Sequence, residues 1–163
     1  MRDTRLSFVR QQGYREQIVD ERLFAALMLQ PRIIGVAVAI GAWLQSAWIF
    51  LALSAVLWWA TIIPTHNLFN AIYNVAVADR RGFPPLVGAP APRRFAMGVA
   101  AIHLLVIAVA LLAGAVTTAW IAEGLFGVAL VAVIFARRCA GASLYYLLSP
   151  SFTRVLAIAA ALR

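Results

Sequence analysis

The chain of 163 residues has no lysine, one cysteine and only six acidic residues, and charged residues make up 12% of it. Soluble domains carry about a quarter charged residues, distributed over their exposed faces. All 14 basic residues are arginines, and none of them falls within residues 33–79 or 95–136. Two long blocks without arginine or lysine, each bounded by arginines, indicate an integral membrane protein.

The scarcity of cysteine and the excess of arginine each exclude a class of function. The single cysteine, Cys139, excludes a disulfide within one chain and a cysteine-based metal cluster built from one subunit. The formal net charge of +8 would suit a nucleic-acid-binding protein. However, the arginines flank apolar runs and do not form a stripe interleaved with exposed aromatic residues. We therefore expect the lipid bilayer as a partner, and no nucleic acid.

The two apolar blocks predict an all-α integral membrane protein with four transmembrane helices arranged as two hairpins. Residues 95–136 would form a helix of about 60 Å, twice the hydrocarbon thickness, so the chain must fold back near residues 114–118. Residues 33–63 would span about 46 Å, and Gln45 and Ser46 lie at their middle between two tryptophans, which favours a turn at the membrane interface. The predicted helices cover residues 31–45, 47–63, 95–113 and 119–138. The first is short unless it recruits residues 23–29.

This arrangement places all three arginine clusters on one side of the membrane and none in the turns between paired helices. An excess of arginine is expected on the cytoplasmic side. We therefore predict a multi-pass protein of the bacterial inner membrane with both termini in the cytoplasm. Its regions are a cytoplasmic segment at residues 1–22, a four-helix membrane domain at residues 23–148 with a cytoplasmic loop at 64–94, and an interfacial tail at residues 149–163.

Short interfacial helices are expected outside the crossings. In residues 68–77 and the residue just before them, the asparagines Asn67, Asn70 and Asn74 recur at three- and four-residue spacing. They give one polar face, which suits a helix lying along the inner interface. In the N-terminal segment, the apolar side chains Leu6, Phe8 and Val9 are expected to touch lipid headgroups or a partner.

His103 is the main candidate for a cofactor-binding residue. It lies two turns inside the third predicted helix, where an ionisable side chain costs free energy unless it finds a partner. A functional His103 would ligate haem or a chlorophyll-type pigment, or relay protons. The alternative is a neutral imidazole bonded to a neighbouring helix, as intramembrane polar groups commonly are. The sequence itself requires no cofactor.

Four other side chains are candidates with ordinary alternatives. His66, with Asn70 one turn further on, would bind an anionic lipid or a ligand at headgroup level, or is simply a solvated histidine. Glu123, near the outer end of the fourth helix, would bind protons or a cation, or is an interfacial carboxylate. Cys139 follows two arginines, which favours a reactive thiol, but cysteine is also an ordinary small helix residue.

Small residues four positions apart suggest where helices approach closely in lipid. Such pairs and ladders are Gly35 with Ala39, and Ala132 with Ala136 and Ala140. They support a bundle of helices without identifying a partner. No Walker loop, zinc-protease helix, nucleophile elbow or paired-carboxylate site is present in the sequence, so no metal site and no enzyme activity are predicted.

Two short segments resemble a known family. Residues 91–97 read Ala-Pro-Arg-Arg-Phe-Ala-Met, and residues 139–145 read Cys-Ala-Gly-Ala-Ser-Leu-Tyr. They are similar to the motifs Pro-x-Arg-Phe-Ala-Gln and Cys-x-Gly-Cys-x-x-Tyr of a bacterial family of four-helix membrane proteins, the domain of unknown function 4395. The resemblance extends loosely over residues 31–148. Met97 replaces the family glutamine, and Ala142 stands where the second family cysteine would be.

The resemblance lends no activity, and the missing second cysteine disfavours dithiol redox chemistry within one chain. The sequence therefore favours a non-enzymatic accessory or structural subunit of a larger inner-membrane complex, of the bioenergetic or photosynthetic kind, with other membrane subunits as partners. The alternatives are a pigment- or haem-binding subunit through His103, and a sulfur, metal or redox helper through Cys139.

Overall fold

The computed structural model describes residues 2–14, 21–83, 85–86 and 88–149, and the regular structure in these residues is entirely helical. The all-α class predicted from the sequence is therefore confirmed. Three helices are long and apolar enough to cross a membrane, namely α2 over Phe24–Leu44, α6 (Ala91–Leu112) and α7 (Val116–Ile134). A fourth apolar helix, α3 (Ala47–Ile62), is shorter at 16 residues.

The first long helix, α2 (Glu21–Leu44), begins ten positions before the predicted start at residue 31 and passes through Pro31 without ending. Residues 23–29 are apolar and continue the same helix, and a proline is tolerated inside a membrane helix when neighbouring groups satisfy the freed backbone. The helix ends at Leu44 because Gln45 takes a left-handed backbone conformation, with φ of 46°. The turn at Gln45 and Ser46 thus lies where the sequence predicts it.

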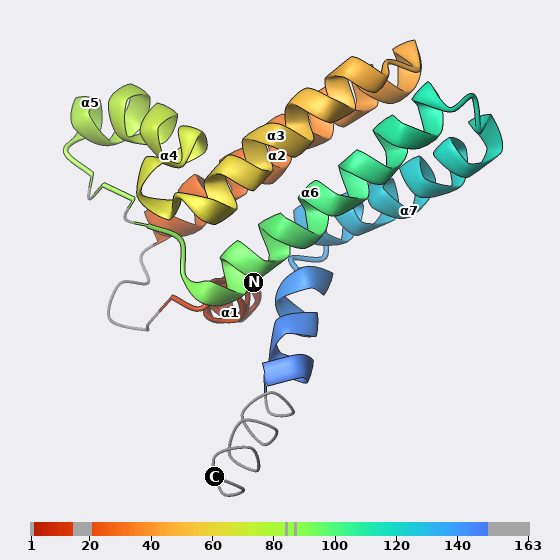
Figure 1. The fold of residues 1–163 in the computed structure, drawn as a ribbon. Coiled ribbons are helices and arrows are strands. Elements are labelled where there is room, and N and C mark those ends of the chain that lie inside the picture. The colour runs from red at the N-terminus through yellow and green to blue at the C-terminus, as the bar shows by residue number, and fades with distance from the viewer. Residues whose placement is uncertain (1, 15–20, 84, 87, 150–163) are drawn as a thin grey trace, which may run out of the picture.

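The most extensive helix contact joins α3 to α6 (Figure 1). Small residues make this approach close: the hydroxyl of Ser54 donates to the carbonyl oxygen of Ala101 at 2.8 Å, and Gly98 faces Thr61. Large apolar side chains surround these small ones and are fully buried, among them Phe50, Leu57, Leu104 and Ile107. The main core of the membrane domain therefore lies between α3 and α6, with α2 and α7 beside it.

The second pair of long helices also differs from the predicted bounds. Helix α6 starts at Ala91, four residues early, because Pro92 in its first turn lacks only an N–H that the helix does not use. The turn to α7 is made at Gly114, with φ of 70°. Helix α7 ends at Ile134, not at residue 138, and Arg137 has a left-handed conformation with φ of 54°. The chain becomes helical again over residues 140–149.

Between α3 and α6 lie a 3-10 turn (Pro64–His66), α4 (Leu68–Tyr73), a π-helical stretch (Asn74–Ala78) and α5 (Asp79–Arg81). The asparagine face of this segment points into the protein. Asn67 caps α4 by accepting from the backbone N–H of Phe69, and the amide of Asn74 exchanges two hydrogen bonds with the backbone of Leu86. The outward-facing side chains are apolar, namely Leu68, Ile72 and Val75.

The N-terminal helix α1 (Arg2–Gln11) closes one end of the bundle (Figure 1). Phe8 and Val9, expected to touch headgroups or a partner, are instead buried within the protein in a second apolar cluster with Leu27 and Met28 of α2. Burying these side chains removes their apolar surface from solvent and attaches the segment to the membrane domain.

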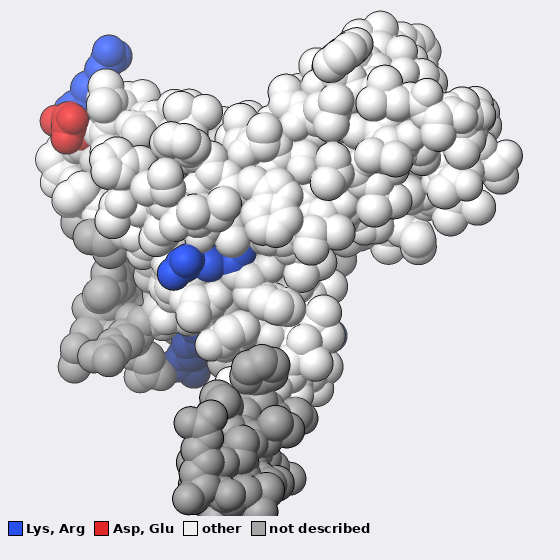
Figure 2. Space-filling view, viewed as in Figure 1, with Lys and Arg blue, Asp and Glu red and all other residues white. Residues whose placement is uncertain are grey.

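Charge is unevenly distributed along the long axis of the molecule. In Figure 2 the visible arginine side chains lie away from the end formed by the turn after α2 and the turn before α7, and that end is uncharged on this face. The exposed tryptophans Trp43, Trp48 and Trp120 lie near those turns, as interfacial anchors do. The predicted interfacial tail lies outside the described residues, apart from Ser149.

Candidate functional site

The two segments that carry the family resemblance lie against each other. Gly141 approaches α6 so closely that an added Cβ would lie 2.8 Å from the Cα of Ala96. The rings of Phe95 and Tyr145 are in contact beside it, with centroids 5.8 Å apart. Ala142, at the position of the second family cysteine, is fully buried. The two segments therefore form one structural unit.

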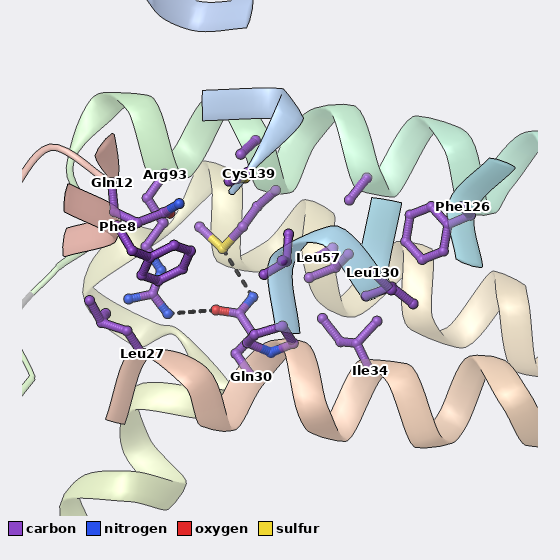
Figure 3. Close-up of a pocket in the computed structure, with 15 residues that line it drawn as sticks. Phe8, Gln12, Leu27, Gln30, Ile34, Leu57, Arg93, Phe126, Leu130 and Cys139 are labelled. Carbon is purple, nitrogen blue, oxygen red and sulfur yellow. Dashed lines mark hydrogen bonds between the residues drawn. The ribbon is translucent and has the colours of Figure 1, made fainter. Parts of the chain in front are cut away.

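A cavity of about 120 Å³ lies next to this unit, where α1, α2, α6 and α7 meet (Figure 3). Arg93 and Gln12 lie at one end of it, and Phe126 and Leu130 at the other. Cys139 also lines the cavity. The lining thus changes from polar to apolar along its length, and it includes one of the residues singled out from the sequence.

The polar end of the cavity is organised by Arg93, of which only 5% is exposed. Its guanidinium donates to the side-chain oxygen of Gln30 at 2.7 Å and to the hydroxyl of Tyr14 at 3.0 Å. The amide nitrogen of Gln30 in turn donates to the sulfur of Met97 at 3.2 Å. Arg93 and Gln30 therefore form a connected, buried polar network.

Gln12 and Cys139 complete the polar lining. Gln12 is 6% exposed, and its side-chain amide has no hydrogen-bond partner among the described residues. The backbone of Cys139 is held by Gln11, whose side-chain oxygen accepts from the Cys139 N–H at 2.9 Å and whose amide donates to the Cys139 carbonyl at 3.2 Å. Gln11 of α1 thus fixes the position at which the thiol meets the cavity.

His103 lies between α6 and α7. Its Nε2 is 2.9 Å from the carbonyl oxygen of Ala122, which can only accept, so Nε2 carries the proton in this bond. The imidazole also contacts the ring of Phe126, with centroids 5.3 Å apart. This geometry matches the helix-bonded alternative, and ligation of a haem or pigment by His103 stays a prediction.

His66 and Asn70 are not brought together as one site. His66 is exposed, with Nδ1 3.0 Å from the Thr65 hydroxyl, and its backbone carbonyl accepts from Trp59 Nε1. It lines an apolar surface groove beside Val56 and Leu68. Asn70 points into the protein, with 5% of it exposed. A ligand at His66 would therefore contact apolar neighbours and not the Asn70 amide.

Glu123 lies at the opposite end of the molecule from the arginine-lined cavity. Gln45 donates to both of its carboxylate oxygens, at 3.1 and 3.3 Å, and accepts from Trp120 Nε1 at 3.0 Å. These bonds join the turn after α2 to the first turns of α7. The carboxylate of Glu123 is therefore held by hydrogen bonds from Gln45.

The small-residue ladders predicted from spacing are only partly realised. Gly35 does face another helix, since an added Cβ would lie 3.4 Å from Ile134, but Ala39 is exposed. The ladder Ala132, Ala136 and Ala140 does not exist as one helix face, because α7 ends at Ile134 and the next helical stretch begins at residue 140. A closer approach than that of Gly35 is made at Gly141, whose added Cβ would lie 2.8 Å from the Cα of Ala96.

The residues that sequence reasoning missed are Gln12 and Gln30, and Arg93 was recognised only as part of an arginine cluster. One signal was available: Gln30 precedes Pro31 inside an otherwise apolar run, where an amide needs a partner. Among the described residues no group of three histidine, cysteine or acidic side chains is arranged to hold a metal ion.

Comparison with known proteins gives one match. The model of a family described as Domain of unknown function (DUF4395) matches residues 24–149. No curated protein and no solved structure matches the chain. The matched region includes most of α2, all of α6 and α7, and Cys139, whereas α1 and Gln12 lie before it.

Proposed function

The chain belongs to this family of unknown function, DUF4395, and we propose that it is a non-enzymatic accessory subunit of a larger bacterial inner-membrane complex. The observation that carries the proposal is the outward face of α7. The most apolar 18-residue stretch of α7 is 17% buried, whereas the corresponding stretches of α2 and α6 are each 39% buried.

The exposed face of α7 has the character of a helix contact surface. Gly124 and Gly127 lie on this helix, and an added Cβ at either would meet nothing within 4 Å. Small residues on a membrane-exposed helix let another helix approach to backbone distance, which lipid alone does not require. An apolar transmembrane helix of another subunit would fit this face between the flanking side chains of Leu125 and Val128.

The proposal includes four crossings with both termini in the cytoplasm. Helix α3 has 16 residues, about 24 Å of helix, and lies along α6, so it would cross with it although it is shorter than the bilayer core of about 30 Å. The Gln45 bonds to Trp120 and Glu123 support a common side for the two turns. The arginine-rich end would then face the cytoplasm.

Membrane-impermeant maleimide labelling tests this topology. In a Cys139→Ser background, Gln45→Cys should be labelled in intact cells stripped of their outer membrane. Arg80→Cys should be labelled only after the inner membrane is permeabilised. The opposite pattern would rule out the proposed orientation.

Purification in a mild detergent tests the accessory role. The wild-type chain should elute with one or more stoichiometric membrane partners. A Gly124→Leu/Gly127→Leu variant should lose them, because its leucines fill the space that the partner helix needs. The matched control is Ala39→Leu on the exposed side of α2, which should keep them. A wild-type chain that elutes alone, or partners retained by the α7 variant, would contradict the proposal.

A further inference from the structure

Among the described residues, the buried guanidinium of Arg93 has only uncharged hydrogen-bond partners. These partners are Tyr14 and Gln30, and within the part of the chain that the structure describes no carboxylate pairs with the guanidinium. Removing a guanidinium from water without a counter-charge costs several kcal/mol, and neutral hydrogen bonds recover only part of it. An anion that binds beside such a cation recovers part of this cost.

The position of Arg93 in α6 adds to the free-energy cost of its buried charge. Arg93 and Arg94 lie in the first turn of the helix, where the exposed N–H groups already carry partial positive charge. Cations at a helix N-terminus are disfavoured, whereas anions are stabilised there. Arg94 reaches out to the carbonyl oxygen of Thr61, but Arg93 turns into the cavity.

Gln12 provides an independent indication of a ligand. Gln12 lines the cavity at the same end as Arg93 (Figure 3), the residue is 6% exposed, and no hydrogen bond joins its side-chain amide to another described residue. Buried side-chain amides are normally hydrogen-bonded. An amide and a guanidinium converging on one end of a cavity supply donors for the oxygens of an anion.

The apolar part of the cavity indicates what kind of group the anion carries. Ile34, Leu57, Phe126 and Leu130 line the end that is farther from Arg93 (Figure 3). An apolar cavity of about 150 Å³ takes a molecule of the size of benzene. The volume of about 120 Å³ includes the polar end, so it suits a small carboxylate whose chain has no more than about six carbons.

We propose that the cavity binds a carboxylate that carries a short apolar chain, with its oxygens on Arg93 and Gln12 and its chain between Ile34 and Phe126. A guanidinium matches the two oxygens of a carboxylate in a bidentate manner. Two kinds of ligand carry such a carboxylate and chain, namely a small free acid and a fatty acid from the bilayer. This inference concerns the inner cavity and not the exposed face of α7, and it does not depend on an accessory role.

Equilibrium dialysis of the detergent-purified full chain with labelled hexanoate tests the proposal, with palmitate and hexanol as comparison ligands. Hexanoate or palmitate should bind saturably, and hexanol much more weakly, because it lacks the charge. Tighter binding of hexanoate would identify the ligand as a small free acid, and tighter binding of palmitate would identify it as a fatty acid from the bilayer. Hexanol binding as tightly as both acids would overturn the proposal.

Two variants locate the site. Arg93→Gln should weaken acid binding about tenfold to a hundredfold, since a hydrogen bond to a charged group contributes about 1.5–3 kcal/mol and 1.4 kcal/mol is tenfold. Arg80→Gln removes the same charge from an exposed arginine and should leave binding unchanged. Unchanged affinity in a folded Arg93→Gln protein would overturn the proposal.

Gln12→Glu keeps the test decisive if Arg93→Gln does not fold. The new carboxylate would occupy the anion position beside Arg93, so acid binding should be lost while the thermal stability of the protein stays equal or rises. A Gln12→Glu protein that still binds hexanoate with wild-type affinity would show that the acid sits elsewhere.

Discussion

Gly141 and Ala96 are in backbone contact, since a Cβ at Gly141 would lie 2.8 Å from the Cα and 2.9 Å from the Cβ of Ala96. Both are parts of the two segments that resemble the family motifs. The contact places Cys139 beside α6, where it lines the same cavity as Met97. The two backbones approach so closely that only a glycine fits at position 141. This is a physical reason for a glycine between Cys139 and Tyr145.

The first prediction concerns this contact. Gly141→Val should lower the free energy of unfolding by about 1–3 kcal/mol, because backbone atoms of α6 cannot move away from the new side chain as a flexible side chain would. Gly124→Val is the matched control, since nothing lies within 4 Å of an added Cβ at Gly124. It should have no destabilising effect. Thermal unfolding of the two variants in the same detergent would compare them, and equal melting temperatures would refute the close contact.

The second prediction concerns Met97, whose sulfur accepts from Gln30 at 3.2 Å and lies 3.8 Å from the Asn67 amide nitrogen. Met97→Leu removes the acceptor and leaves the buried Gln30 amide nitrogen unsatisfied, at a cost of about 1–3 kcal/mol. Met97→Gln, the residue of the resembling motif, supplies a stronger acceptor of similar length and should be tolerated. Denaturation of both variants measures the difference. If leucine were tolerated better than glutamine, the hydrogen bond would contribute nothing.

The helical segments were predictable because hydrocarbon thickness and the absence of charge act on whole stretches of sequence. The turns at Gln45 and Gly114 were found for the same reason, since each lies where an apolar block is too long for one crossing. The helix ends were less accurate. Pro31 looked like a start but lies inside α2, because proline removes only one N–H and the apolar side chains on both sides of it continue one helix.

The cavity was not predictable, because its polar residues are far apart in the sequence. Arg93 and Gln30 are 63 positions apart, and Arg93 and Tyr14 are 79 apart. An arginine at the end of a membrane helix is ordinarily expected to reach the headgroups, so the burial of Arg93 follows from its tertiary contacts with Gln30 of α2 and with Tyr14. Similarly, the spacing of small residues did not distinguish Ser54 and Gly98, which pack helices together, from Ala39, which is exposed.

The third prediction concerns His103. Its bond to the Ala122 carbonyl joins α6 to α7, and such bonds in membrane bundles contribute about 0.6 kcal/mol and at most about 1.7. His103→Leu should therefore destabilise the protein by about that amount without changing its absorption spectrum. The measurement is thermal unfolding together with a visible spectrum of each preparation. A visible band that is present in the wild type and lost in His103→Leu would instead establish His103 as a pigment or haem ligand.

The fourth prediction concerns the hydrogen bonds that join α1 to Cys139. Gln11 makes three hydrogen bonds to this region, two with the backbone of Cys139 and one at 2.7 Å with the Ser143 hydroxyl. Gln11→Ala removes them all and should let α1 open more often, because local opening is governed by the few contacts that oppose it. A loss of about 1–1.4 kcal/mol corresponds to a five- to tenfold faster alkylation of the Cys139 thiol.

The control for this fourth experiment is Gln45→Ala, which also removes an amide that bridges two segments, but at the other end of the molecule. It should leave the alkylation rate of Cys139 at the wild-type value. The rate is measured with a small maleimide on the purified full chain, which has no other thiol. If Gln11→Ala and Gln45→Ala gave the same rate, α1 would not control access to the thiol. A faster rate in Gln11→Ala alone would show that the N-terminal helix covers the cavity lined by Cys139 and Arg93.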